Sequence, residues 1–183
     1  LGCVPGFRGP EGANYLFEND YMQRYIFNRV LIEITDVDDL THDDDVTVTT
    51  YRGVNAILTS ANGKDYIAGG TQKVDERWGK RYIHSLKGRI VDGVLTTDPG
   101  DIKLPYALTF DTNPDQAFKA ARFSLKLTPT SAEGVLGAYV DVKNWQHRFT
   151  INWSTHHASY GQMSTPSIVR AMRRLADAYP DPV

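Results

Sequence analysis

The sequence contains a single cysteine, Cys3, among its 183 residues. One cysteine cannot form a disulfide within the chain, and it excludes a CxxC redox pair, a CxxCH haem attachment and a zinc ribbon. The fold must therefore be stabilised by its own hydrophobic core. A chain of this length can bury roughly 70% of the surface that its unfolded form exposes, so a full core is within reach.

Long hydrophobic runs and a surplus of basic residues are also missing. The strongest apolar run, residues 30–32, is followed at once by Glu33, so nothing in the sequence is predicted to span a membrane. The 20 Lys and Arg residues are outnumbered by 22 Asp and Glu residues, which gives a net charge of −2. This balance excludes a strongly basic nucleic-acid-binding protein, and a hydrophobic content of 41% excludes a disordered chain.

The two ends of the sequence differ from its middle. Leu1-Gly2-Cys3 has the small-residue-then-cysteine pattern of a bacterial lipoprotein cleavage site. A processed lipoprotein would begin at the cysteine, so an ordinary loop cysteine is the favoured interpretation and a lipid anchor at Cys3 is the alternative. We interpret 1–183 as a single β-rich domain whose ends, 1–13 and 180–183, are extended arms or linkers.

Short segments rich in Val, Ile, Thr and Tyr alternate with turn residues through the middle of the chain. Asn62-Gly63 and Asp92-Gly93 each lie between apolar runs, and such pairs favour hairpins because both central residues need a positive φ. A further strand is expected over 104–110, with Pro105 placing its start at a sheet edge. The spacing predicts a mainly β fold, either an antiparallel β-sandwich or a jelly-roll-like fold.

A C-terminal amphipathic helix is expected after Thr165, because Pro166 suits the first turn of a helix. Pro180 is expected to end it. The apolar residues at helical spacing are Ile168, Met172, Leu175 and Tyr179.

The densest charge feature is Asp36–Asp45, which holds six aspartates in ten residues. Without these six acids, 16 remain against 20 bases, so the rest of the chain is net +4. Calcium prefers oxygen ligands, so the segment is a candidate calcium site. The sixth position of a helix–loop–helix calcium motif would hold Thr41 in place of glycine, so a solvated acidic loop that protects strand edges remains the favoured interpretation. The candidate ligands are Asp36, Asp38, Asp39 and Asp43.

Aromatic residues at four-residue spacing form a second candidate site. Trp145, Phe149 and Trp153 would share one stripe of a helix, and their default role is core packing. The functional alternative is a stacking platform for a sugar or another flat ligand. Its candidate ligand-binding residues are Trp145, Arg148, Trp153 and His156.

Catalytic and nucleic-acid-binding patterns are weak. His156 and His157 are adjacent, but the sequence has no HExxH, HxH or GxSxG motif. The basic residues of 73–89 are interleaved with Trp78 and Tyr82, yet Asp75 and Glu76 lie among them. A solvated strand face, or a contact with the acidic loop of a neighbour, is therefore favoured over a nucleic-acid surface.

These features favour a non-catalytic binding module of an exported or surface protein, periplasmic or extracellular, that recognises a protein or carbohydrate partner. Two alternatives stay open. One is an accessory structural subunit of a larger assembly. The other is a metal-assisted hydrolase that uses the Asp36–Asp45 loop with His156 or His157.

Overall fold

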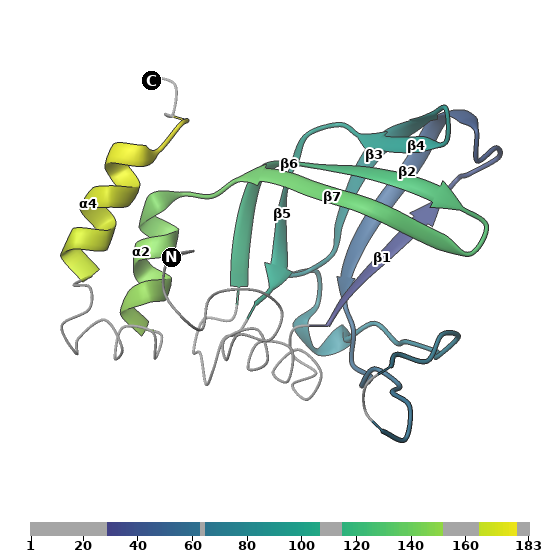
Figure 1. Cartoon of the computed structure of the whole chain (residues 1–183), viewed down its shortest axis with the longest axis horizontal. Coiled ribbons are helices and arrows are strands. Elements are labelled where there is room, and N and C mark those ends of the chain that lie inside the picture. Colours follow the sequence, from purple (N-terminus) through teal and green to yellow (C-terminus); the bar gives the residue numbers. More distant parts are fainter. Residues whose placement is uncertain (1–28, 63–64, 107–114, 152–164, 179–183) are drawn as a thin grey trace.

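The computed structural model describes residues 29–62, 65–106, 115–151 and 165–178, with side chains left out at 147–151, 165–166 and 168. Within these residues, seven strands form one antiparallel sheet in the order β1-β2-β3-β4-β6-β5, and β7 pairs with β6 (Figure 1). The mainly β prediction is confirmed. A sandwich or jelly roll is not confirmed, because the described strands belong to one continuous sheet. The strands are β1 (Val30–Thr35), β2 (His42–Arg52), β3 (His84–Val91), β4 (Val94–Thr97), β5 (Gly100–Pro105), β6 (Asp115–Thr128) and β7 (Ser131–Tyr139).

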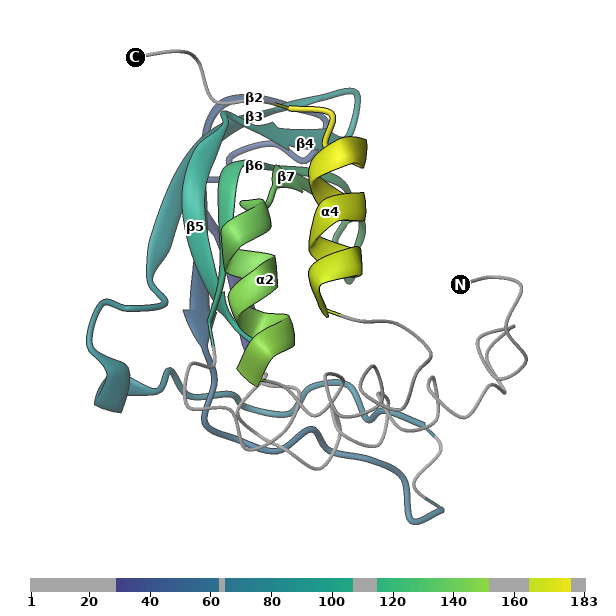
Figure 2. The ribbon, with the colours of Figure 1, turned by 90° about the vertical axis from the view of Figure 1, so that its left-hand side faces the viewer.

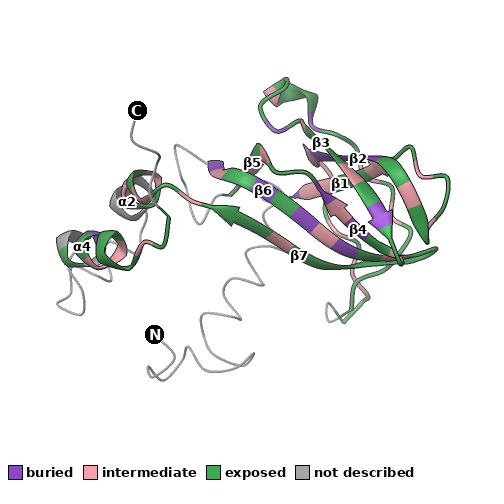
Figure 3. Cartoon of the chain, turned by 90° about the horizontal axis from the view of Figure 1, so that it is seen from above, coloured by how far each residue is buried: buried purple, intermediate pink, exposed green. Residues whose placement is uncertain are grey.

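The core lies on the inner face of this sheet. Along β2, the side chains of Val46 and Val48 are fully buried, and Val48 lies opposite Leu86 of β3. β5 contacts β2 and β3 although, among the described strands, it pairs only with β6, so the sheet curls over its own apolar face. Figure 3 shows the buried residues concentrated along these strands. The core consists of Val46, Val48, Leu86, Ile90, Leu95, Ile102, Ala121, Phe123 and Leu125.

Local chemistry sets the connections between strands. Asp92 and Gly93 have φ values of 51° and 77°, so the predicted β3–β4 hairpin is confirmed. In β6 the ladder shifts between Lys119 and Arg122, and Ala120 has a φ of 47°. This bulge divides β6, whose first half pairs with β5 and whose second half pairs with β4.

Two other strand predictions need correction. The two arms around Asn62-Gly63 do pair, through an antiparallel bridge between Thr59 and Tyr66 and a hydrogen bond from the Ile67 N–H to the Leu58 carbonyl at 2.9 Å, but 56–62 and 65–68 form no strands. Residues 63 and 64 lie outside the described residues. The strand expected over 104–110 instead begins at Gly100, and Pro105 is its last residue. Pro105 therefore ends the described strand, where its missing N–H costs the ladder little.

In the described part of the chain, two helices follow the sheet, α2 (Val142–Ile151) and α4 (Thr165–Leu175). They contact each other and lie side by side (Figure 2), beyond the end of β7 (Figure 1). The predicted C-terminal helix is confirmed, but its apolar stripe is shorter than expected. Val169 is buried, whereas Leu175 is 74% exposed. The helix expected to continue to Pro180 ends at Leu175, and residues 176–178 are not helical. Pro180 itself and the predicted arms lie outside the described residues.

Candidate functional site: a charged cluster around Trp78

A short 3-10 helix, η2 (Glu76–Trp78), forms in the connection between β2 and β3. Asp75 caps it, because the Asp75 carboxylate accepts a hydrogen bond from the Arg77 N–H at 3.2 Å. Gly79 ends it with a φ of 53°, a conformation that favours glycine. This turn places the Trp78 ring edge-on to the ring of Tyr82, with 5.8 Å between centroids.

Asp75 joins two arginines. Its side chain is 1% exposed and its oxygens accept from Arg77 Nε and Nη2, each at 2.8 Å. On its other side it forms an ion pair with Arg52, whose side chain is 5% exposed. A buried carboxylate is stabilised only when charge and hydrogen bonds compensate its lost hydration, and here two guanidinium groups do so.

Asp115, the first residue of β6, is the second carboxylate that pairs with cationic side chains here. Arg81 donates to Asp115 Oδ2 from Nε at 2.9 Å and from Nη2 at 2.5 Å. The hydroxyl of Tyr82 donates to the other oxygen, Oδ1. Lys103 of β5 places its Nζ 3.8 Å from Oδ2. One carboxylate therefore ties the β2–β3 connection to β5 and β6.

We call the assembled residues the Trp78 cluster. Counted over the described residues, it holds four cations against two carboxylates, which gives a surplus of two positive charges. Its members are Arg52, Asp75, Arg77, Trp78, Arg81, Tyr82, Lys103 and Asp115.

The charges around the cluster shift several pKa values. Burial lowers the pKa of Arg52, and the nearby charge of Arg77 lowers it further. Burial and the hydrogen bond to Asp115 raise the pKa of Tyr82, so its hydroxyl stays protonated in the physiological range. Burial also lowers the pKa of His84, the first residue of β3, and the charge of Lys103 acts in the same direction.

The arginines also contact the aromatic rings. The guanidinium carbon of Arg81 lies 5.3 Å from the Trp78 ring centroid and 5.8 Å from that of Tyr82. Arg52 lies 6.0 Å from the Trp78 ring. These are cation–π distances. The cluster combines surplus positive charge with an aromatic surface, an arrangement suited to binding an anionic group.

The Asp36–Asp45 segment is organised by its own backbone. Asp43 accepts hydrogen bonds from the N–H groups of Asp38 at 2.6 Å, Asp45 at 3.1 Å and Asp39 at 3.4 Å. Asp39 accepts from the N–H of Thr41 at 2.6 Å. These backbone donors lower the pKa values of Asp39 and Asp43.

The segment is also not wholly a loop, because β2 begins at His42. Asp36 accepts from the Thr47 hydroxyl at 2.9 Å, and Asp45 pairs with Lys87 at 2.7 Å. Within the described part of the chain, no group of three or more Asp, Glu, His or Cys side chains is placed to hold a metal ion. Calcium binding at Asp36, Asp38, Asp39 and Asp43 stays a prediction.

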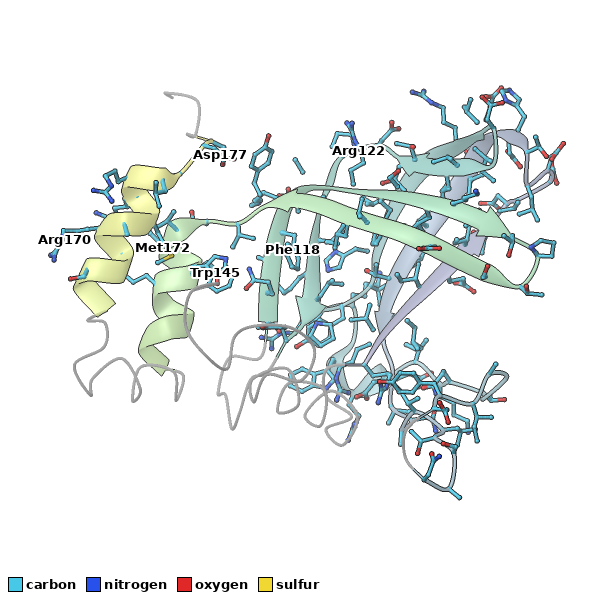
Figure 4. The ribbon with its side chains drawn as sticks, in the orientation of Figure 1. Phe118, Arg122, Trp145, Arg170, Met172 and Asp177 are labelled. Atoms are coloured by element: carbon cyan, nitrogen blue, oxygen red, sulfur yellow. The ribbon has the colours of Figure 1, made fainter. Side chains whose placement is uncertain are left out.

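The predicted aromatic platform is described only in part. Trp145 lies on α2 and is 37% exposed. Figure 4 shows Met172 between the two helices, with Trp145 on the side of α2 that faces away from α4. The side chain of Arg148 and all of Trp153, His156 and His157 lie outside the described residues. The platform and the histidine hydrolase both stay predictions.

The basic stretch singled out in the sequence is divided by the fold. Arg77 and Arg81 enter the Trp78 cluster, whereas Lys87 lies on the outer face of β3 and pairs with Asp45. Sequence reasoning missed Arg52, Lys103 and Asp115 as site residues. They stand on three different strands, and only the sheet order brings them together.

None of the helices in the described residues is long and apolar enough to cross a membrane. Comparison of the chain with protein-family models, with curated proteins and with solved structures finds no match.

Proposed function

We propose that this chain is a non-catalytic protein-interaction module that binds an acidic segment of a partner protein at the Trp78 cluster. The observation that carries the proposal is the surplus of two positive charges around a partly exposed tryptophan. A partner carboxylate would offset this surplus, and an arginine can bind it with two parallel hydrogen bonds.

The chemistry of the cluster favours binding over catalysis. Asp75 and Asp115 both accept from arginines, so neither carboxylate is poised to remove a proton from a substrate. Tyr82, with its raised pKa, is a poor nucleophile. The cationic side chains remain accessible, since Arg77 is 71%, Lys103 42% and Arg81 37% exposed.

Exposed apolar residues within three positions of cluster members in the sequence favour a protein segment over a free inorganic anion. Val74 is 39%, Ile83 38% and Tyr106 37% exposed. Val74 precedes Asp75, and Ile83 follows Tyr82. Surfaces that bind protein segments combine exposed aromatic or aliphatic side chains with arginine, whereas a site for inorganic phosphate needs only charge.

The binding test uses a fluorescently labelled peptide of alternating Glu and Tyr, followed by fluorescence anisotropy. Removing one exposed cation with Arg77→Gln should weaken binding about tenfold, the effect of losing one charge-assisted hydrogen bond. Arg89→Gln removes the same charge from the exposed outer face of β3 and should leave the affinity unchanged.

Three results would contradict the proposal. The peptide could fail to bind, a Gln-Tyr peptide could bind equally well, or the two variants could lose affinity equally. Inorganic phosphate should compete only weakly, and strong competition would instead assign a small-anion site. A glycan panel tests the carbohydrate alternative. The exported setting, the lipid anchor and calcium stay predictions.

A further inference from the structure

β7 has a free edge. Among the described residues it pairs only with β6, and eight of its nine residues are exposed. The side chains of Val135 and Tyr139 are 68% and 56% exposed. In an antiparallel ladder the backbone groups of alternate residues point away from the paired neighbour, so β7 presents N–H and C=O groups at this edge.

This edge carries few of the features that usually prevent strand pairing, and the extra residue of the bulge in its ladder lies on β6. Natural edge strands are blocked by Lys, Pro, bulges or short length. β5, whose far edge is also unpaired among the described strands, has six residues and carries Asp101, Lys103 and Pro105. β7 is nine residues long and contains no Lys or Pro, and Glu133 is its one charged residue.

The order of residues along β7 suits pairing with itself. We propose that two copies of this chain associate through antiparallel pairing of β7 with β7, about a two-fold axis at Val135. In this register Val135 meets its symmetry mate, Ser131 meets Tyr139, and Glu133 meets Gly137. Like charges directly opposite each other would destabilise such a pair, and this register has none.

The surroundings of β7 are compatible with the dimer. Lys126 of β6 lies opposite Glu133 in the register of the sheet, so a residue of opposite charge is already its cross-strand neighbour. The two helices lie beyond the Tyr139 end of β7, so they do not flank the strand (Figures 1 and 3). The two-fold arrangement closes at two copies and joins both sheets into one.

The first test measures the mass of the full chain by sedimentation equilibrium. The natural sequence should give twice the mass of one chain, and Val135→Lys, which sets two lysines face to face, should reduce it to one. Val91→Lys is the matched control, because Val91 is a 44% exposed valine on β3. Circular dichroism of both variants should confirm an unchanged fold.

The second test fixes the register by oxidative cross-linking in a Cys3→Ser background. Val135→Cys should form a disulfide-linked dimer, because directly opposed Cβ atoms lie within reach of a disulfide. Glu133→Cys should not, because its symmetry mate would be four residues away. A monomeric natural chain, an open series of larger species, a dimer that survives Val135→Lys, or equal cross-linking at both positions would overturn the proposal.

Discussion

Asp75 shows what one buried carboxylate contributes to stability. The variant Asp75→Ala removes the carboxylate that pairs with Arg52, whose side chain is 5% exposed. Breaking a buried ion pair from one side costs about 3–5 kcal/mol, so the urea midpoint should fall markedly. Asp45→Ala is the control, because Asp45 is 78% exposed and its pair with Lys87 lies in solvent. A similar loss in both variants would contradict the buried ion pair.

The pKa of His84 predicts that the stability of the fold depends on pH. This pKa is lowered in the folded state by burial and by Lys103, so the unfolded chain takes up the proton first as pH falls. Stability should therefore be complete above the ordinary histidine pKa of about 6.5 and decline below it. Urea midpoints measured across this range should show the decline, and His84→Gln should reduce it. An unchanged slope in the variant would assign the effect to other groups.

Only some contacts of the Trp78 cluster could be predicted from the sequence. The interleaving of Arg77 and Arg81 with Trp78 could be recognised because they are close in the chain. Asp115 lies 34 residues after Arg81, so its pairing follows from the arrangement of β5 and β6. Local spacing cannot encode such a contact.

At the scale of elements, the packing of β7 against β6 depends on a missing side chain. A Cβ added at Gly134 would collide with the backbone carbonyl of Ser124. Gly134→Ala should therefore destabilise the protein by about 1–3 kcal/mol, the usual cost of overpacking. At Gly137, on the same strand, an added Cβ meets nothing within 4 Å, so Gly137→Ala should be tolerated. Equal melting temperatures for the two variants would contradict this packing.

Hairpins could be predicted from the sequence where the turn residues alone determine the local backbone conformation. The Asp92-Gly93 hairpin follows from two positive φ values that the sequence demands. The Asn62-Gly63 pair carries the same signal, yet Thr59 and Tyr66 form only an isolated bridge. A turn signal yields a ladder only if the flanking residues bury a shared apolar face, and Leu58 and Ile67 are 51% and 52% exposed.

On the scale of the whole molecule, acidic and basic side chains are concentrated in different places. The aspartates of residues 36–45 and the Trp78 cluster lie at opposite ends of β2, whose 11 residues span roughly 34 Å. The attraction between an acidic partner and the Trp78 cluster should weaken as ionic strength rises, because the Debye length is about 8 Å at physiological salt. A peptide affinity that does not change with added salt would contradict this electrostatic contribution.

The sheet and the helical pair should also differ in stability. The apolar core is drawn from the strands, while Leu175 of α4 and Trp145 of α2 remain exposed. Local opening is easiest where few apolar contacts are buried, so amides of α2 and α4 should exchange with deuterium before those of β2 and β3. Mass spectrometry of exchanged peptides checks this order. Simultaneous exchange would indicate one cooperative unit.

The central position of β6 has a consequence for synthesis on the ribosome. β6 pairs with β4, β5 and β7, and it supplies Ala121, Phe123 and Leu125 to the core. Until residues 115–128 have emerged, β4 has no partner on one side and three of the nine core residues are missing. A nascent chain paused before that point would expose both, making it a substrate for chaperones.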